Sequence, residues 1–413
     1  MESNIRQQLY DAVIDRLRGH ASITPETIRA AVADAAEWLA LHKDVQAPPE
    51  VRRAVADGIL TDMRGFGPIQ VLMDDPEVTE IMVNGPQAVY AERSGRKTLT
   101  GLRFRDEPDL RRMVERLLMP SGRRVDESLP YADFALDDGS RVHAILPPLS
   151  MGGATVTIRK FLKSLRTVRD LVRLGTLDDR MADFLEGCIR ARINILFSGP
   201  TGSGKTTTVE ILSACIDPQE RIITIEDAPE LSLRQHHVVR LLTRPPNLEG
   251  QGEVTIRILF KNTLRMRPTR IILGEIRGEE ALDYLQAQTS GHRGCLAVIH
   301  AASPGDAIAR LETLALYAGV NLPPWAVRQQ IASGLQLIVQ HEQLGDGRRV
   351  ITHITEVAGM AGSDVQSRDI FSFTVEEALP GEAVRGRFVA HRVPDFYPLF
   401  RQRGVVLDER VFT

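Results

Sequence analysis

Residues 199–206 combine the residue types and the spacing that bind a triphosphate. Their sequence, Gly-Pro-Thr-Gly-Ser-Gly-Lys-Thr, fits the pattern G-x-x-x-x-G-K-[ST] without a gap. The second and third glycines allow successive backbone N–H groups to turn inward around phosphate oxygens. Lys205 is expected to reach the β- and γ-phosphates, and the Thr206 hydroxyl to bind Mg²⁺. We therefore predict that a nucleoside triphosphate binds to Gly199, Pro200, Thr201, Gly202, Ser203, Gly204, Lys205, Thr206 and Thr207.

Two apolar segments further along the chain end in carboxylates. Residues 221–225 lead to Glu226, with Glu230 close behind, and residues 270–273 lead to Glu275. Because ligands gather at the carboxyl ends of parallel strands, these acids are expected to handle Mg²⁺ or the attacking water. Glu275 is expected to orient or deprotonate that water, or to hold a magnesium-bound water, from a strand beside that of the triphosphate loop. The simpler alternatives are a solvated acidic turn and a surface glutamate.

Two histidines flank a fourth apolar segment. His292 precedes this segment and His300 follows it, with nearby glycines that permit close backbone approach. The placement favours sensing of the γ-phosphate, although a single histidine is more often structural than catalytic. Neither histidine has metal-ligand spacing to a cysteine or to another histidine, so we expect no zinc site.

The surrounding segments must position these residues. The apolar run at 193–197 predicts a buried strand and residues 207–214 have helical character, so the glycine-rich loop joins a strand to a helix. The chain before this unit changes from amphipathic helical spacing to short β-like runs with turns. We predict an α/β fold with a helical N-terminal region, a smaller α/β N-terminal domain, a linker and a P-loop NTPase domain, at residues 1–64, 65–160, 161–168 and 169–413.

The composition limits the choice of partners and compartment. The 413 residues carry a formal net charge of −3 and 5% aromatic residues, which gives no global basic surface for nucleic acid. We therefore expect no nucleic-acid partner. No segment approaches 18 apolar residues and the N-terminus lacks a signal-peptide pattern, so a cytoplasmic protein is expected.

The order of these motifs resembles the secretion ATPases of type II and type IV systems. In that superfamily they correspond to Walker A, an acidic box, Walker B and a His box. The chain is most similar to the CpaF-like branch, the Tad (tight adherence) pilus assembly ATPases, and it lacks the four-cysteine zinc insertion common in type II secretion motors. Segments that carry the resemblance are residues 78–86, 122–128, 138–144, 237–247, 252–257 and 354–360.

The resemblance implies a homohexameric ring whose subunits join an N-terminal domain to a RecA-like ATPase domain. It implies hydrolysis of ATP at the cytoplasmic face of the inner membrane, where the ring would drive pilus platform proteins. It also implies roles in phosphate and Mg²⁺ binding for Lys205 and Thr206, and in catalysis for Glu226, Glu230, Glu275, His292 and His300. Less directly, it implies arginines near phosphate or at an interface at Arg141, Arg159, Arg240 and Arg244.

Two other functions are compatible with the same motifs. The first is a nucleic-acid-translocating ATPase of the conjugation or competence type, which would need a basic channel lined with aromatic residues. The second is a ring scaffold that binds ATP without hydrolysing it. The presence of Lys205, Thr206 and Glu275 favours hydrolysis over that second alternative.

Overall fold

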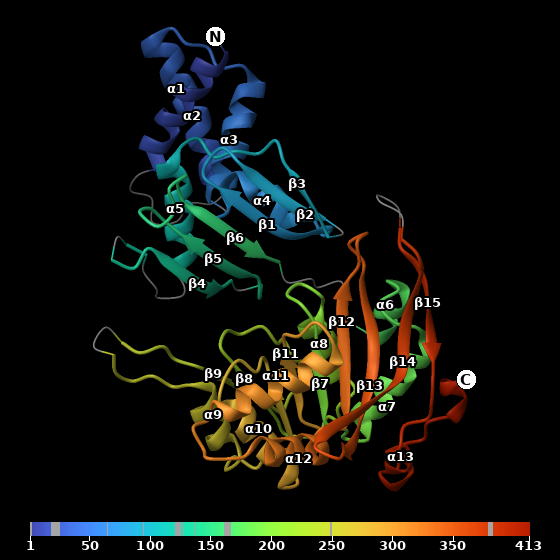
Figure 1. Cartoon of the computed structure of the whole chain (residues 1–413). Helices are drawn as coiled ribbons and strands as arrows, with labels where there is room; N and C mark the ends of the chain where they lie inside the picture. Colours follow the sequence, from blue (N-terminus) through green and yellow to red (C-terminus); the bar gives the residue numbers. More distant parts are fainter. Residues whose placement is uncertain are drawn as a thin grey trace. The chain divides into compact units, whose positions relative to one another are not determined.

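The computed structural model describes residues 2–17, 25–63, 65–93, 95–119, 125–126, 128–136, 138–160, 167–247, 250–378 and 383–413 (Figure 1). The chain divides into two compact units, Met1–Phe161 and Leu162–Thr413, which are described one at a time. Residues 161–166 of the expected linker and residues 122–124 of one motif lie outside the described residues. Among the described helices, none has the length and apolar character needed to cross a membrane.

The first unit begins with three helices that pack on one another. These are α1 (Glu2–Leu17), α2 (Pro25–Lys43) and α3 (Pro49–Met63). Proline at the first position suits the start of α2 and α3, because the first N–H groups of a helix have no intrahelical partner. The three helices share an apolar cluster that includes Leu9, Val13, Val32, Leu39 and Val55.

An antiparallel sheet of six strands forms the rest of the first unit, in the order β3-β2-β1-β6-β5-β4. Strands β5 and β6 alternate buried and more exposed residues, as expected of a sheet with one covered face. Helix α5 buries Leu110, Met113, Val114 and Leu118 in the same apolar cluster as the sheet. The elements are η1 (Gly67–Ile69), α4 (Gln70–Asp74), β1 (Val78–Asn84), β2 (Val89–Arg93), β3 (Arg96–Leu99), α5 (Glu107–Leu118), β4 (Tyr131–Ala135), β5 (Arg141–Ile145) and β6 (Thr155–Arg159).

The second unit is built on a sheet of nine strands, in the order β15-β14-β13-β12-β7-β11-β10-β8-β9. The six strands from β12 to β9 are parallel to one another, and β13, β14 and β15 continue the sheet antiparallel. The strands are β7 (Ile195–Ser198), β8 (Ile222–Glu226), β9 (Val238–Leu242), β10 (Arg270–Leu273), β11 (Leu296–Ile299), β12 (Leu337–Gln343), β13 (Arg349–Ala361), β14 (Asp364–Glu377) and β15 (Arg385–Ala390).

Helices cover both faces of this sheet. One apolar cluster joins a face of the central strands to α6, α7, α8 and the C-terminal segment, and a second joins the other face to α9, α10, α11 and α12. The mixed α/β fold expected from the sequence is confirmed. The helices are α6 (Val168–Arg173), α7 (Asp179–Arg190), α8 (Lys205–Ser213), α9 (Ile256–Thr263), α10 (Glu280–Thr289), α11 (Pro304–Leu316), α12 (Pro324–Gly334), α13 (Pro398–Gln402) and η3 (Glu409–Phe412).

The parallel register places the carboxyl ends of four strands at one edge of the sheet. Leu273 of β10 pairs with Ile225 of β8 and with Ala297 of β11, and Ile299 of β11 pairs with Ser198 of β7. The expectation that β10 lies beside the strand of the glycine-rich loop is wrong, because β11 lies between them. Strand β11 has four residues, all of them apolar, so its sequence does not indicate which strands lie beside it.

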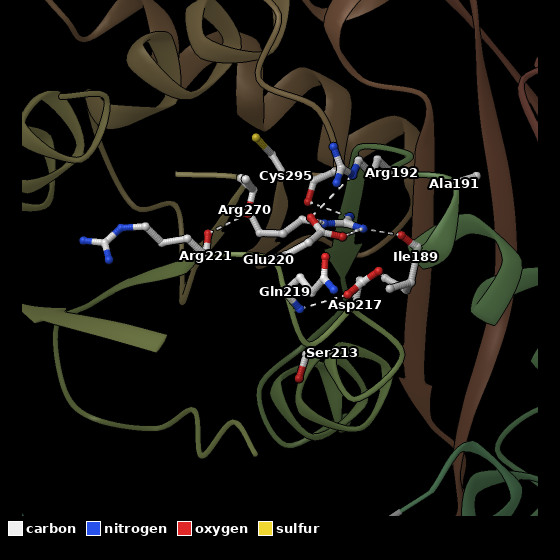
Figure 2. Close-up of polar contacts among 12 residues, drawn as sticks. Ile189, Ala191, Arg192, Ser213, Asp217, Gln219, Glu220, Arg221, Arg270 and Cys295 are labelled. Carbon is white, nitrogen blue, oxygen red and sulfur yellow. Dashed lines mark hydrogen bonds and ion pairs between the residues drawn. The ribbon is translucent and has the colours of Figure 1, made fainter. Parts of the chain in front are cut away.

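A buried arginine holds the amino ends of these strands together (Figure 2). Arg270, at the start of β10, is 1% exposed and forms a two-pronged ion pair with Glu220, with N–O distances of 2.7 and 3.1 Å. Its guanidinium also donates to the carbonyl oxygens of Ile189, at 2.6 Å, and Gly294, at 3.3 Å. A Cβ at Gly294 would lie 2.0 Å from the guanidinium, so this position accepts only glycine without a shift.

Candidate functional site

The glycine-rich loop begins where β7 ends and finishes at the first residue of α8. Gly199 has a φ of +148°, and a Cβ there would lie 2.4 Å from the carbonyl oxygen of His341. The close approach of β12 therefore requires glycine at the first position of the loop. Within the loop, the Ser203 hydroxyl donates to the carbonyl oxygen of Pro200 at 2.8 Å.

The loop has the features that hold phosphate. A Cβ at Gly202 would meet no heavy atom within 4 Å, which leaves space beside the backbone at this position. The N-cap of α8 is Gly204, which has no side chain, so no capping side chain occupies the first N–H groups of the helix. These N–H groups and the positive end of the helix dipole favour an anion. The residues present therefore fit the phosphates of a nucleotide.

Lys205 is connected to Glu275 through His300. The Lys205 ammonium donates to the carbonyl oxygen of Pro200 at 2.7 Å and lies 3.5 Å from Nδ1 of His300. Nε2 of the same imidazole lies 3.2 Å from Oε1 of Glu275. A neutral imidazole protonated at Nε2 satisfies both contacts, because it donates to the carboxylate and accepts from the ammonium. The histidine thus bridges the loop lysine and the acid after β10.

Glu275 is strongly acidic in this setting. Burial acts to raise the pKa of its carboxyl, but hydrogen bonds from His300 and Arg277 outweigh burial and lower the pKa to about 2. The Arg277 guanidinium donates to Oε2 of Glu275 at 2.6 Å and lies 3.6 Å from a carboxylate oxygen of Asp227. Glu275 is therefore ionised at neutral pH, with a cation or a histidine at each oxygen.

The pKa of Glu226 is shifted in the opposite direction from that of Glu275. Its side chain is 2% exposed, and Oε1 accepts the backbone N–H groups of Glu230, at 2.9 Å, and Leu231, at 2.7 Å. Burial raises the pKa of Glu226 to about 7, although these two hydrogen bonds act to lower it. Arg240 of β9 lies 4.0 Å from Oε2. Glu226 therefore holds the backbone of the acidic turn at Glu230 and Leu231, and it can also titrate.

Thr206 and Glu230 offer oxygen ligands side by side. The Thr206 hydroxyl lies 3.4 Å from Oε2 of Glu230, at the start of α8 and directly beside Lys205. A hydroxyl and a carboxylate are ligands that suit Mg²⁺ held together with substrate phosphates. The two residues therefore fit the expected cation. Within the described residues, no group of three or more histidine, cysteine or acidic side chains is placed to bind a metal by itself.

Other predicted residues lie elsewhere. His292 precedes β11 whereas His300 follows it, so the two histidines lie at opposite edges of the sheet and only His300 lies at the loop. Arg244 donates to the carbonyl oxygen of Gly252 at 2.7 Å within the segment after β9. In the first unit, Arg141 and Arg159 face each other in register on β5 and β6.

Three residues at the site were not predicted as site residues from the sequence. Arg277 contacts Glu275, as described above. Arg349, at the start of β13, donates to the carbonyl oxygen of Gly202 at 2.8 Å. His341 lies behind the loop, where burial and the nearby Lys205 lower the pKa of its imidazole to about 3. Only Arg277 had a local signal, because it stands two positions after Glu275 on a predicted strand end.

Comparison with known proteins places the chain in a family. The model of the family described as "Type II/IV secretion system protein" matches residues 62–348. A Mycobacterium tuberculosis protein provisionally named as a conjugal transfer protein is 34% identical over 300 residues, which cover 71% of this chain and 85% of that protein. VirB11 of Agrobacterium fabrum is 33% identical over 309 residues, covering 68% of this chain and 89% of VirB11.

A solved structure supports the fold. The structure of the Legionella pneumophila ATPase DotB aligns with a TM-score of 0.50 and 19% identity, covering 68% of this chain and 77% of DotB. The expected fold, a RecA-like P-loop domain preceded by a smaller α/β domain, is confirmed. With a family match over most of its length and relatives above 30% identity, this chain belongs to the family of type II/IV secretion system proteins.

Proposed function

We propose that this protein hydrolyses ATP to drive a secretion or pilus-assembly machine. The observation that carries the proposal is the continuous set of contacts from the loop lysine through His300 to Glu275. Glu275 and His300 follow the carboxyl ends of β10 and β11, and Lys205 begins the helix after the loop that follows β7, at the edge where ligands of parallel α/β folds bind. An arrangement that links a phosphate-binding lysine to an acid suits hydrolysis better than binding alone.

Different residues at the loop would bind the phosphates and the Mg²⁺ ion. The backbone N–H groups of Gly199–Thr207, except Pro200, which has none, would surround the phosphates. Lys205 would exchange its contact with Pro200 for the β- and γ-phosphates. Thr206 and Glu230 would hold Mg²⁺, whose charge offsets the negative charge that develops on the phosphates. His300 lies close enough to Lys205 to respond when the ammonium moves to the phosphate.

Of the two candidate acids, we assign Glu275 to the attacking water. A catalytic base must first lie within reach of the reacting atoms, and only then does its pKa matter. Glu275 is the acid that contacts His300, which in turn lies beside the loop lysine. Glu226 has a pKa nearer neutrality, but its side chain is 2% exposed and one oxygen is engaged by two backbone N–H groups. We therefore assign Glu226 to holding the acidic turn that presents Glu230.

The arginines and His292 suggest that the site is completed on assembly. We assign residues 65–160 to an N-terminal domain and residues 169–413 to the ATPase domain of a homohexamer. Arg141 and Arg159 in the first, or Arg240, Arg244 and His292 in the second, would then act at a domain or subunit boundary. Hydrolysis should depend on assembly, so specific activity should fall on dilution to protein shown by light scattering to be monomeric. Constant specific activity in the monomer would contradict this assignment.

We assign the motor to a Tad-type pilus at the cytoplasmic face of the inner membrane. The sequence motifs shared with CpaF-like proteins support this choice, and the expected partners are the platform proteins of that membrane. The name of the Mycobacterium tuberculosis relative favours a second candidate, a conjugation ATPase that moves nucleic acid. Phosphate release measured with and without single-stranded DNA separates the candidates. ATP hydrolysis unaffected by DNA is expected, stimulation by DNA would favour conjugation, and no hydrolysis would leave an ATP-binding scaffold.

A further inference from the structure

Arg277 lies in a position from which it can control the proposed hydrolytic acid. Its guanidinium donates to Oε2 of Glu275 at 2.6 Å, while His300 lies against the other carboxylate oxygen at 3.2 Å. The guanidinium also lies 3.6 Å from a carboxylate oxygen of Asp227, which follows β8. One side chain thus joins the acid after β10 to the acidic turn after β8.

The backbone of Arg277 is fixed as well as its side chain. The N–H groups of Arg277 and Gly278 both donate to Oε1 of Glu280, at 2.6 and 2.9 Å, and Glu280 is 6% exposed at the first position of α10. A surface arginine with a free backbone loses much side-chain entropy in an ion pair and gains little from it. Here the turn is already held by a buried carboxylate, so the guanidinium is directed at Glu275 at lower entropic cost.

Resting on the proposed ATPase function, we infer that Arg277 is a positioning residue that acts through the Glu275 carboxylate and limits its strength as a base. In the proposed reaction the water oxygen bonds to the γ-phosphorus, the bond from that phosphorus to the β–γ bridging oxygen breaks, and one water proton passes to Glu275. A carboxylate paired with a guanidinium takes that proton less readily than one that is not.

Several charged groups surround Glu275 and must be considered together. His300 and Arg277 contact it directly and lower the pKa of its carboxyl. Behind these two lie Lys205, near His300, and Asp227 and Glu230, whose charges act on Arg277. Replacing Arg277 by glutamine removes one of the two direct partners and leaves burial and His300. The carboxyl of Glu275 should then regain a pKa nearer its ordinary value.

The test is single-turnover hydrolysis of ATP between pH 4.5 and 8.5 by wild type, Arg277→Gln and Arg277→Lys. At pH 8 the glutamine variant should hydrolyse about three to ten times faster than wild type, because Glu275 is a stronger base. Towards pH 4.5 its rate should fall relative to that of wild type, because the Glu275 carboxyl begins to protonate in the variant and stays ionised in wild type. The lysine variant should lie near wild type, and ATP affinity should change less than about twofold in both variants.

Each alternative role of Arg277 gives a different result. A purely structural arginine would slow hydrolysis without changing its pH dependence, and an arginine that binds phosphate would lose about tenfold or more in ATP affinity. Either outcome overturns the inference. Glu226 and Glu210 have pKa values that burial raises to about 7, so only the difference between each variant and wild type is interpreted.

Arg169 supplies the matched control. Its side chain, on α6, is 47% exposed, and its guanidinium lies 2.6 Å from Asp179 and 2.5 Å from Asp183, both on α7 of the same unit. Arg169→Gln removes an arginine that pairs with two acids but lies outside the proposed site, and it should leave the pH profile unchanged. Absence of hydrolysis in the wild type would refute the proposed function itself. A hydrolysing wild type with an unshifted Arg277→Gln profile would refute only the inference.

Discussion

Glu275 and His300 form a hydrogen-bonded pair, with Oε1 of the glutamate 3.2 Å from Nε2 of the histidine. The pair spans neighbouring strands, because Glu275 follows β10 and His300 follows β11. Since β11 separates β10 from β7, the acid reaches the P-loop through this histidine and not through direct strand pairing. Changes at Lys205 can therefore be passed to Glu275 by one imidazole that contacts both.

The first prediction concerns the loop lysine. Lys205→Ala should weaken ATP binding roughly 10- to 100-fold, because that factor corresponds to the free energy of a hydrogen bond to a charged group. The same substitution should abolish hydrolysis. Isothermal titration calorimetry and phosphate release measure the two effects. The control is Lys261→Ala, because Lys261 of α9 has a 56% exposed side chain whose ammonium lies 3.8 Å from Asp283. Hydrolysis at the wild-type rate by folded Lys205→Ala protein would contradict the P-loop assignment.

The second prediction is a pH dependence of stability at Glu226. Burial raises the pKa of this carboxyl to about 7 in the folded protein, above the ordinary value of about 4.3. The native state then binds more protons than the unfolded state, so stability from this group is present below about pH 4.3 and is lost as pH rises through 7. Glu226→Gln cannot ionise and should escape this loss.

Urea denaturation of wild type and Glu226→Gln at pH 5 and pH 8.5 tests the second prediction. The variant should gain on the order of 2 kcal/mol relative to wild type between the two pH values. Glu210, whose pKa burial also raises to about 7, is present in both proteins, so its contribution differs between them only through the smaller influence of the Glu226 charge. If the difference in unfolding free energy between wild type and Glu226→Gln is the same at both pH values, ionisation of Glu226 does not destabilise the folded protein and the prediction is wrong.

The third prediction concerns the buried pair at the amino ends of the strands. Arg270→Met should destabilise the second unit by about 3–5 kcal/mol, because it leaves the Glu220 carboxylate buried without its main partner. Adding Glu220→Leu should recover part of that loss, since an apolar pair replaces the ionic pair. Thermal unfolding measures both variants. Equal stability of Arg270→Met and wild type would contradict the role given to this pair.

Gly294 offers an independent check on the same contact. Gly294→Ala places a Cβ against the Arg270 guanidinium and in backbone with a φ of +69°, so it should destabilise by more than about 1 kcal/mol. In the Arg270→Met background most of the clash is gone, so the same substitution should cost less there. Additive effects of the two substitutions would show that the clash does not determine the glycine.

Local motifs in the sequence predicted the site better than the order of the strands. The strand, loop and helix around Lys205 were predicted because the pattern fixes backbone and side-chain chemistry together. The contact between Arg349 and Gly202 joins residues 147 positions apart, and no local pattern indicates it. Strand β9 was not predicted because its residues are half-exposed and lack a clear alternation.

The two predicted histidines illustrate a limit of reasoning from sequence proximity. His292 and His300 are eight positions apart in one motif, which suggested one site. The residues between them include β11, and a strand advances about 3.3 Å per residue. The four-residue strand therefore carries the chain across the sheet and places the two imidazoles at opposite edges. Of the two, only His300 lies at the loop that holds Lys205.

The most direct test of the account is single-turnover ATP hydrolysis by Glu275→Gln, measured beside ATP affinity. The substitution keeps the shape of the side chain and removes the charge that would orient water or accept its proton. We predict affinity within about threefold of wild type and hydrolysis at least about 100-fold slower. Glu226→Gln, measured in parallel, should retain more activity than Glu275→Gln. Wild-type hydrolysis by Glu275→Gln together with loss of hydrolysis in Glu226→Gln would contradict the assignment of the catalytic acid.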